Sequence, residues 1–258
     1  MSERLWRMWK VAGFGWTAFR AENPTRVIVT MMLPRAILQC AFVAMLGRVV
    51  GGTDLSYALS GSLAVILTLS GAVAVMDVPL SDKWSGTFHR IRSGRLPVFV
   101  VFVLRSWPYA LLGVFFMLVA LLGVVAVVGA WHLGWQLVLW TPMYLLMSAT
   151  VCASGLAGAA LAAGRNADII AGNLISSLIL LSSGIVLSPG QLSWVEWIGT
   201  VLPVTHGLAA VRSGLDGDPW VSDALAEVAV GIGWVLLAGV IVSVQARRAR
   251  ISGHDDFV

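Results

Sequence analysis

The side chains that most often do chemistry are few in this sequence, and their spacing matches no common catalytic or metal-binding pattern. A phosphate-binding loop needs a lysine directly after glycine, yet Lys10 follows tryptophan and Lys83 follows aspartate. The four histidines are scattered, and Cys40 and Cys152 each lie inside an apolar run. No H-E-x-x-H stretch or paired-carboxylate site stands within the apolar runs. We therefore expect no catalysis, no metal site and no cofactor bound by this chain.

Charged side chains do gather in one short stretch, DKWSGTFHRIRSGRLP at 82–97, which separates two apolar runs. The family resemblance given below implies a short helix in this loop, which Gly86 can begin and Thr87 can cap. That helix would carry two apolar and two charged side chains, namely Phe88, Ile91, Arg90 and Arg92. Taken alone, the stretch is typical of an ordinary basic loop beside a membrane.

The elements that hold this loop are predicted to be membrane-spanning helices. The chain of 258 residues is 58% hydrophobic and 12% charged, whereas soluble domains carry about 25% charged residues. We expect an all-α polytopic membrane protein of one domain: residues 1–26 at the interface, a bundle over 27–246 and a tail over 247–258. Apolar runs long enough to cross a bilayer predict six spans, at 27–50, 56–78, 108–128, 138–163, 169–187 and 224–246.

The N-terminal residues predict an amphipathic helix over 3–22. Leu5, Trp9, Trp16 and Phe19 are among the apolar residues near one helical face, and basic residues supply the polar positions. Such a helix lies at the membrane interface, although Gly13 and Gly15 weaken it.

The distribution of basic residues predicts the orientation. Most of the 17 Lys and Arg residues fall in segments that share one side when the N-terminus is placed inside. We expect a multi-pass protein of the bacterial plasma membrane, with both termini and the 82–97 loop in the cytoplasm. Because basic residues beside anionic lipid explain the net charge of +4, we expect no nucleic-acid partner.

A second informative stretch is VLPVTHGLAAVRSGLDG at 201–217. The surrounding segment 188–223 is too long for a tight turn and too interrupted for another span. It predicts two short helices separated at Pro203.

These two stretches together resemble the permease subunits of type-2 ABC exporters of the daunorubicin-resistance type. The family has a Gly-Thr loop after its second span and an LP-x-x-x-x-L-x-x-x-R segment before its sixth, which Leu202, Pro203 and Arg212 match here. Lys83, Trp84 and Ser85 stand where the family usually has acidic residues.

The resemblance implies a dimeric exporter of an amphipathic drug, lipid, glycan or peptide, often linked to antibiotic resistance. The 82–97 loop would dock on one of two cytoplasmic ATPase subunits, which would bind ATP and Mg. The partner permease would be a second copy or a paralogue. The helices within 188–223 would be re-entrant and would cap the exit of the pathway.

Two polar residues interrupt the first span. Arg35 lies about 13 Å beyond Arg26 along a helix, and Gln39 is one turn further on the same face. A cation at that depth normally faces protein or water. Two interpretations stay open: structural pairing or snorkelling of Arg35, and a wall of the substrate path.

Small residues recur in the fourth span, where Ser154, Gly158 and Ala162 follow one another at four-residue spacing. This pattern predicts close packing between helices.

Two alternatives to the exporter remain at this point. In an ATP-independent ion-coupled carrier, Arg35, Asp77 and Arg105 would be coupling groups, and transport would continue without ATP. In a membrane immunity or binding subunit, protection would persist after a partner ATPase is inactivated.

Overall fold

The computed structural model describes residues 3–49, 52–162, 168–185 and 193–252, and no strand occurs among them. This confirms the prediction of an all-α fold for the described residues. Five helical stretches are long and apolar enough to span a membrane: Thr25–Val49, Leu55–Asp82, Val98–Val128, Thr141–Ala162 and Val221–Arg248.

The fifth expected span corresponds to α10 (Asp168–Ser182). Its 15 residues extend about 22 Å, less than the roughly 30 Å of a bilayer core. The last expected residues, 186 and 187, lie outside the described part of the chain. The count of six spans therefore stays a prediction.

Several element boundaries differ from the sequence expectation. The third span is one continuous helix, α7 (Val98–Val128), with Pro108 inside it. The fourth begins at α9 (Thr141–Ala162), after a separate α8 (Trp131–Leu139). Helix α13 (Val221–Ser252) continues into the expected tail, while 253–258 lie outside the described residues.

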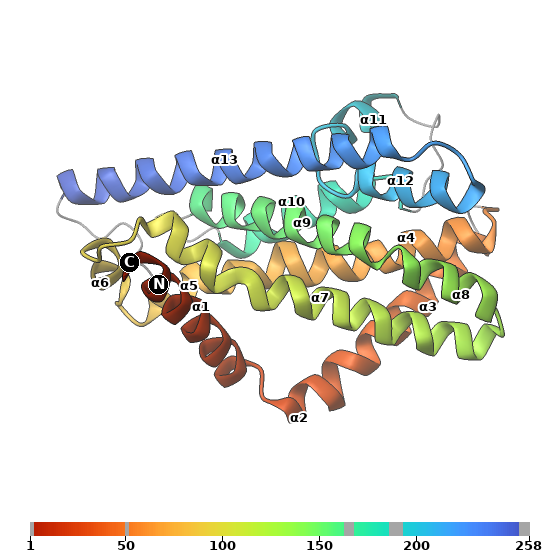
Figure 1. Ribbon diagram of the computed structural model, residues 1–258, viewed down its shortest axis with the longest axis horizontal. Coiled ribbons are helices and arrows are strands. Elements are labelled where there is room, and N and C mark those ends of the chain that lie inside the picture. The colour runs from red at the N-terminus through yellow and green to blue at the C-terminus, as the bar shows by residue number, and fades with distance from the viewer. Residues whose placement is uncertain (1–2, 50–51, 163–167, 186–192, 253–258) are drawn as a thin grey trace.

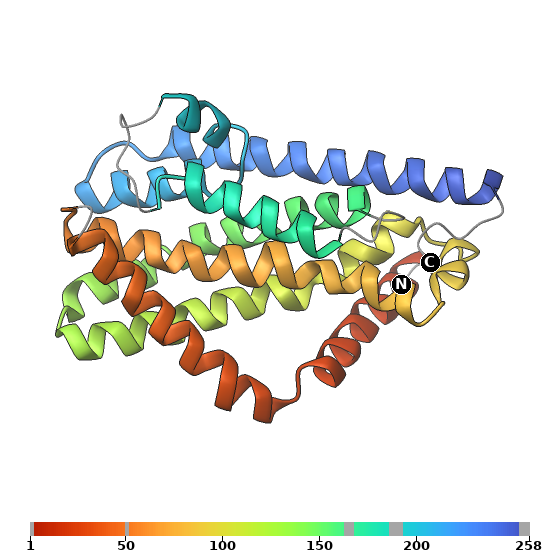
Figure 2. The same cartoon turned by 180° about the vertical axis from the view of Figure 1, so that it is seen from behind.

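The long helices run roughly side by side, and the short ones lie at the two ends of the bundle (Figures 1 and 2). One end holds α5 (Asp77–Trp84) and α6 (Phe88–Arg92); the other holds α8, α11 (Ser193–Gly199) and α12 (Thr205–Asp216). We call the first the basic end because it carries the arginines of the 82–97 loop. α9, which is mostly buried, packs against α7 and α13.

Helix α1 (Glu3–Glu22) packs along α7. Trp107 Nε1 donates to the carbonyl of Ala12 at 3.0 Å, and the rings of Phe19 and Tyr109 meet edge to face. Gly15 lies so close to α7 that a Cβ there would be 2.8 Å from the Cα of Arg105. The glycine expected only to weaken α1 thus permits its close approach to α7.

From α1 the chain turns at α2 (Thr25–Val27) into α3 (Leu33–Val49), and α1 and α3 form a V that opens toward the bundle (Figures 1 and 2). The π-helical turn η1 (Ile28–Met32) precedes Pro34, which has no amide hydrogen to donate to the preceding turn. A second π-helical turn, η2 (Leu69–Val73), and a 3-10 turn, η3 (Ala74–Met76), follow α4 (Leu55–Thr68) before α5. Turns of both kinds mark places where a helix departs from regular α geometry.

Close packing of α9 on η2 gives a first testable prediction. A Cβ at Gly155 would lie 2.7 Å from the carbonyl oxygen of Ala72 and 2.5 Å from Val75 Cγ1. Because backbone cannot move aside cheaply, we expect Gly155→Ala to lower the free energy of unfolding by about 1–3 kcal/mol. Thermal unfolding in detergent measures this. The control is Gly233→Ala, where a Cβ meets nothing within 4 Å; equal melting temperatures for the two variants would contradict the prediction.

Candidate functional site

The 82–97 loop folds back on the end of α5 at the basic end. Gly86 has a φ of +62°, a conformation that favours glycine, and it lets the chain turn into α6. Thr87 stands at the N-cap position as expected, but its hydroxyl makes no bond to the helix. Instead Thr87 Oγ1 donates to Asp82 Oδ1 at 3.0 Å, and the Thr87 amide donates to the Asp82 carbonyl at 3.0 Å. Asp82 therefore fixes the start of α6.

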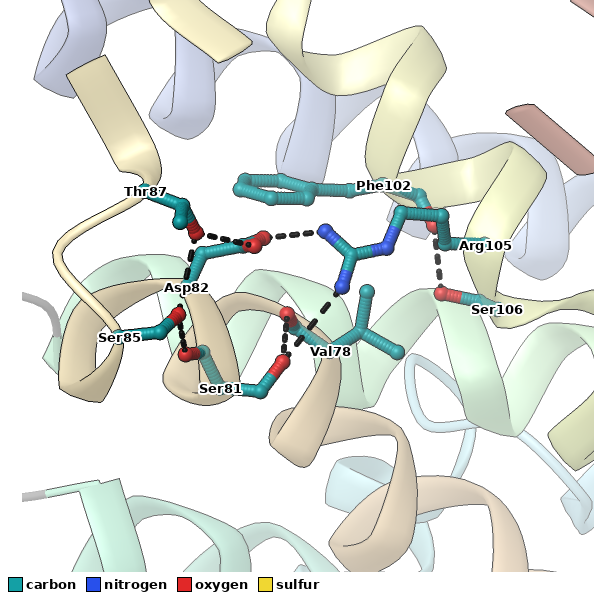
Figure 3. Close-up of polar contacts among 8 residues, drawn as sticks. All are labelled: Val78, Ser81, Asp82, Ser85, Thr87, Phe102, Arg105 and Ser106. Carbon is teal, nitrogen blue, oxygen red and sulfur yellow. Dashed lines mark hydrogen bonds and ion pairs between the residues drawn. The ribbon is translucent and has the colours of Figure 1, made fainter. Parts of the chain in front are cut away.

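The same carboxylate forms a buried ion pair with Arg105 of α7 (Figure 3). The two side chains are only 8% and 6% exposed, and Arg105 Nη2 lies 3.5 Å from Ser81 Oγ. The ring of Phe14, from α1, lies 5.3 Å from the guanidinium. Opposite charges removed from water interact strongly when they are paired. The pair therefore links α5, α6, α7 and α1 at one point.

Phe88 anchors the other side of α6. Its side chain is 1% exposed and stacks on Phe102 of α7, with ring centroids 6.4 Å apart. Phe88 belongs to the loop that the resemblance assigns to ATPase docking, yet the short loop turns this side chain toward the bundle. Arg90 stays exposed, and Ile91 and Arg92 are partly buried.

A groove of about 540 Å³ lies between α1, α6 and the start of α7. Its floor is apolar and includes Trp6, Phe14, Ile91 and Val101. Its basic lining residues are Arg7, Lys10, Arg90 and Arg95, beside the buried pair. An apolar groove with a cationic rim suits an amphipathic protein segment with acidic residues.

The LP…R segment forms a second polar cluster at the opposite end. Leu202 and Pro203 are buried beside α12, and Arg212 reaches across to α4. Its guanidinium donates to the carbonyls of Gly184 at 2.8 Å and Tyr57 at 3.2 Å, and it lies 3.3 Å from the centre of the Tyr57 ring. Burial lowers the pKa of Arg212, and Tyr57 opposes that shift. The arginine thus holds α12 against α4 from within the protein.

Glu227 of α13, which no sequence motif predicts as a functional residue, completes this cluster. Its side chain is fully buried, yet it accepts three hydrogen bonds. They come from the amides of Val204 and Gly207, each at 3.0 Å, and from Thr150 Oγ1 at 2.6 Å. Val204 has a φ of +81°, which is unusual for a β-branched residue. The carboxylate therefore caps α12 from another helix, where donors at a helix N-terminus favour negative charge.

Comparison with known families decides what kind of protein carries these clusters. A sequence model described as ABC-2 type transporter matches residues 16–215, well over half of the chain. The chain belongs to the ABC-2 type transporter family. No curated protein matches it.

Membership makes this chain a multi-pass transport permease of an ABC transporter, and permeases of this kind are generally not catalytic. The match includes both stretches from which the sequence resemblance was inferred, the 82–97 loop and the LP…R segment. Helix α13, with Glu227, follows the matched region of this ABC-2 permease.

The two polar residues of the first span lie apart from both clusters. Arg35 is exposed and Gln39 is partly buried on α3. Both line a cavity of about 340 Å³ that α3 shares with η2, α5 and α7. The structure therefore brings Arg35 and Gln39 together, as their four-residue spacing predicts.

Proposed function

We propose that this ABC-2 permease forms the membrane pathway of an ATP-driven exporter of an amphipathic substrate. It would work as a dimer with a second copy or a paralogue, and with two ATPase subunits that bind ATP and Mg. The observation that carries the proposal is the way α6 is held. Its buried face is fixed to α7 through Phe88 and Asp82, while Arg90 and the basic groove remain open to a partner.

This arrangement supports mechanical coupling between the ATPase and the spans. A short helix that is anchored in the bundle transmits a push to the helices that hold it, because packed cores deform little. Movement of α6 would act on α7 through Arg105 and on α5 through Asp82. The ATPase would thereby drive the permease without any chemistry in this chain.

The remaining finer features are part of the same proposal. The basic end would face the cytoplasm of a bacterial cell, with both termini on that side, and α10 would complete a sixth span. Helices α11 and α12 would be re-entrant and would close the exit, a position consistent with their place at the end opposite α6 (Figure 1). The loop and the LP…R segment support the daunorubicin-resistance type.

Copurification tests the coupling role. Tagged permease from its native host should retain an ATPase chain in mild detergent. The double variant Arg90→Glu/Ile91→Asp should retain roughly tenfold less, because it reverses the charge of the exposed Arg90 and places a charge in the apolar floor of the groove at Ile91. Arg48→Glu, on an exposed residue of α3, is the matched control.

Size-exclusion chromatography of the permease alone checks that each variant stays folded. Equal ATPase recovery for the double variant and the control would contradict the assignment of α6. Absence of any nucleotide-binding chain, with transport that follows an ion gradient, would favour the ion-coupled carrier instead. Retained protection after loss of the ATPase would favour an immunity subunit.

A further inference from the structure

The cavity beside α3 contains charge of both signs. It lies between the end of α1, α3, η2, α5 and α7, and its volume is about 340 Å³. Arg35 and Gln39 line it from α3, and Asp77 lines it from α5. Aliphatic and aromatic residues form most of the remaining wall. The cavity is therefore an apolar pocket with a few polar groups, as small-molecule sites commonly are.

The two charged side chains that line this cavity, Arg35 and Asp77, have no partner among the described residues. Neither forms an ion pair or side-chain hydrogen bond with the part of the chain that the structure describes, in contrast to the paired Arg105 and Asp82. A lone charge in the bilayer centre costs about 2.5 kcal/mol or more. Both charges lie in stretches long and apolar enough to span a membrane, where a charged side chain normally faces protein or water. A ligand with complementary charges would therefore stabilise them.

The acidic side of the cavity is reinforced from α1. Tyr109, another lining residue, donates from its hydroxyl to Glu22 Oε2 at 3.1 Å. Two carboxylates therefore stand near one side, while Arg35 supplies the cation on α3. A purely anionic ligand would meet Arg35 favourably but would be repelled near Asp77 and Glu22. A purely cationic ligand would be attracted near Asp77 and Glu22 but repelled near Arg35.

The surface beside the cavity suits an apolar chain. Met31, Leu38 and Phe42 are large apolar residues on η1 and α3 that are 66%, 70% and 65% exposed. A volume of about 340 Å³ is near the lower end for ligand sites, which span roughly 300–1,000 Å³. It accommodates a polar headgroup, and the attached chain would lie outside it along α3.

We infer that this cavity binds the headgroup of a zwitterionic amphipath, with a phosphate-type anion at Arg35 and an amine at Asp77. The inference rests on the proposed transport function and names the substrate class for it. Gln39, one turn above Arg35, would donate to the same anion. The class includes phospholipids with an amine headgroup.

Native mass spectrometry of the purified permease, without any ATPase, tests this binding. The probes are dioleoyl phosphatidylethanolamine, which has phosphate and amine, and dioleoyl phosphatidylglycerol, which has phosphate alone. We expect the ethanolamine lipid to be retained about fivefold better, the effect of one partly exposed ion pair. Asp77→Asn should abolish that preference without weakening the glycerol lipid, and Arg35→Ala should weaken both lipids.

Two further variants keep the result interpretable. Arg35→Lys retains the cation and should restore binding, and Arg48→Ala removes an exposed arginine of α3 outside the cavity lining. Equal retention of the two lipids, or an Asp77→Asn variant that keeps the preference, would overturn the inference. Recovery of an ATPase in the copurification experiment would then leave the exporter proposal standing. If the ethanolamine lipid binds selectively but no ATPase copurifies, the exporter proposal is contradicted and the lipid site is not.

Discussion

Asp82→Ala is expected to destabilise the permease by about 3–5 kcal/mol, because it leaves the buried charge of Arg105 without its partner. The side chain of Arg105 is 6% exposed, so water cannot replace the lost carboxylate. Thr87 also loses its acceptor, and the turn into α6 loses its fixed point. Thermal unfolding in detergent measures the loss of stability.

The double variant Asp82→Leu/Arg105→Met distinguishes the effect of an unpaired buried charge from the effect of lost packing. Replacing both members of a buried ion pair by apolar residues is often neutral or stabilising. We expect the double variant to recover most of the stability lost in Asp82→Ala. If the single and double variants melt at the same temperature, the ion pair is not what stabilises this end of the bundle.

Glu227→Ala is expected to be as damaging at the opposite end, by about 3–5 kcal/mol. The change leaves the amides of Val204 and Gly207 and the hydroxyl of Thr150 buried without their acceptor. Glu227→Gln keeps one carbonyl oxygen and should lose less, about 1–2 kcal/mol. Hydrogen exchange of 199–216 should rise in the alanine variant, because the start of α12 loses its cap.

Asp218→Ala is the matched control for Glu227. Asp218 is an exposed acidic residue in the link between α12 and α13, and exposed substitutions of this kind usually change stability by less than about 0.5 kcal/mol. Two results would show that the buried carboxylate does not hold the helix. One is faster hydrogen exchange of α12 in the Asp218→Ala control, and the other is unchanged exchange of α12 in Glu227→Ala.

Hydrophobic run length predicted the spans well because a bilayer imposes a minimum apolar length. It placed the start of the third span at Pro108, whereas α7 begins at Val98. Pro108 lies inside α7, since neighbouring helices compensate for a missing amide within a membrane bundle. At Thr141 the reverse holds: an apolar run that looked continuous is divided between α8 and α9.

Motif spacing located the two polar clusters but not their partners. The Gly-Thr loop and the LP…R segment were identified from residues close together in sequence. Arg105 is 23 residues from Asp82 and Glu227 is 77 residues from Thr150, so each pair depends on how the helices pack. The burial of Phe88 was not predicted either, because a five-residue helix does not reveal which of its faces meets the bundle. A carboxylate within the sixth apolar run was the one available signal for Glu227.

The π-helical turns η1 and η2 carry a consequence for rotational register. A π-helical turn amounts to one residue inserted into an α-helix, and each residue of an α-helix advances about 100° around the axis. A helical wheel drawn with uniform α-helical spacing therefore gives the wrong relative direction for two residues that lie on opposite sides of such a turn. Met31 lies inside η1, Arg35 and Gln39 follow it, and Asp77 lies beyond η2. The direction in which Arg35 and Gln39 face therefore depends on η1, and that of Asp77 depends on η2 together with the 3-10 turn η3.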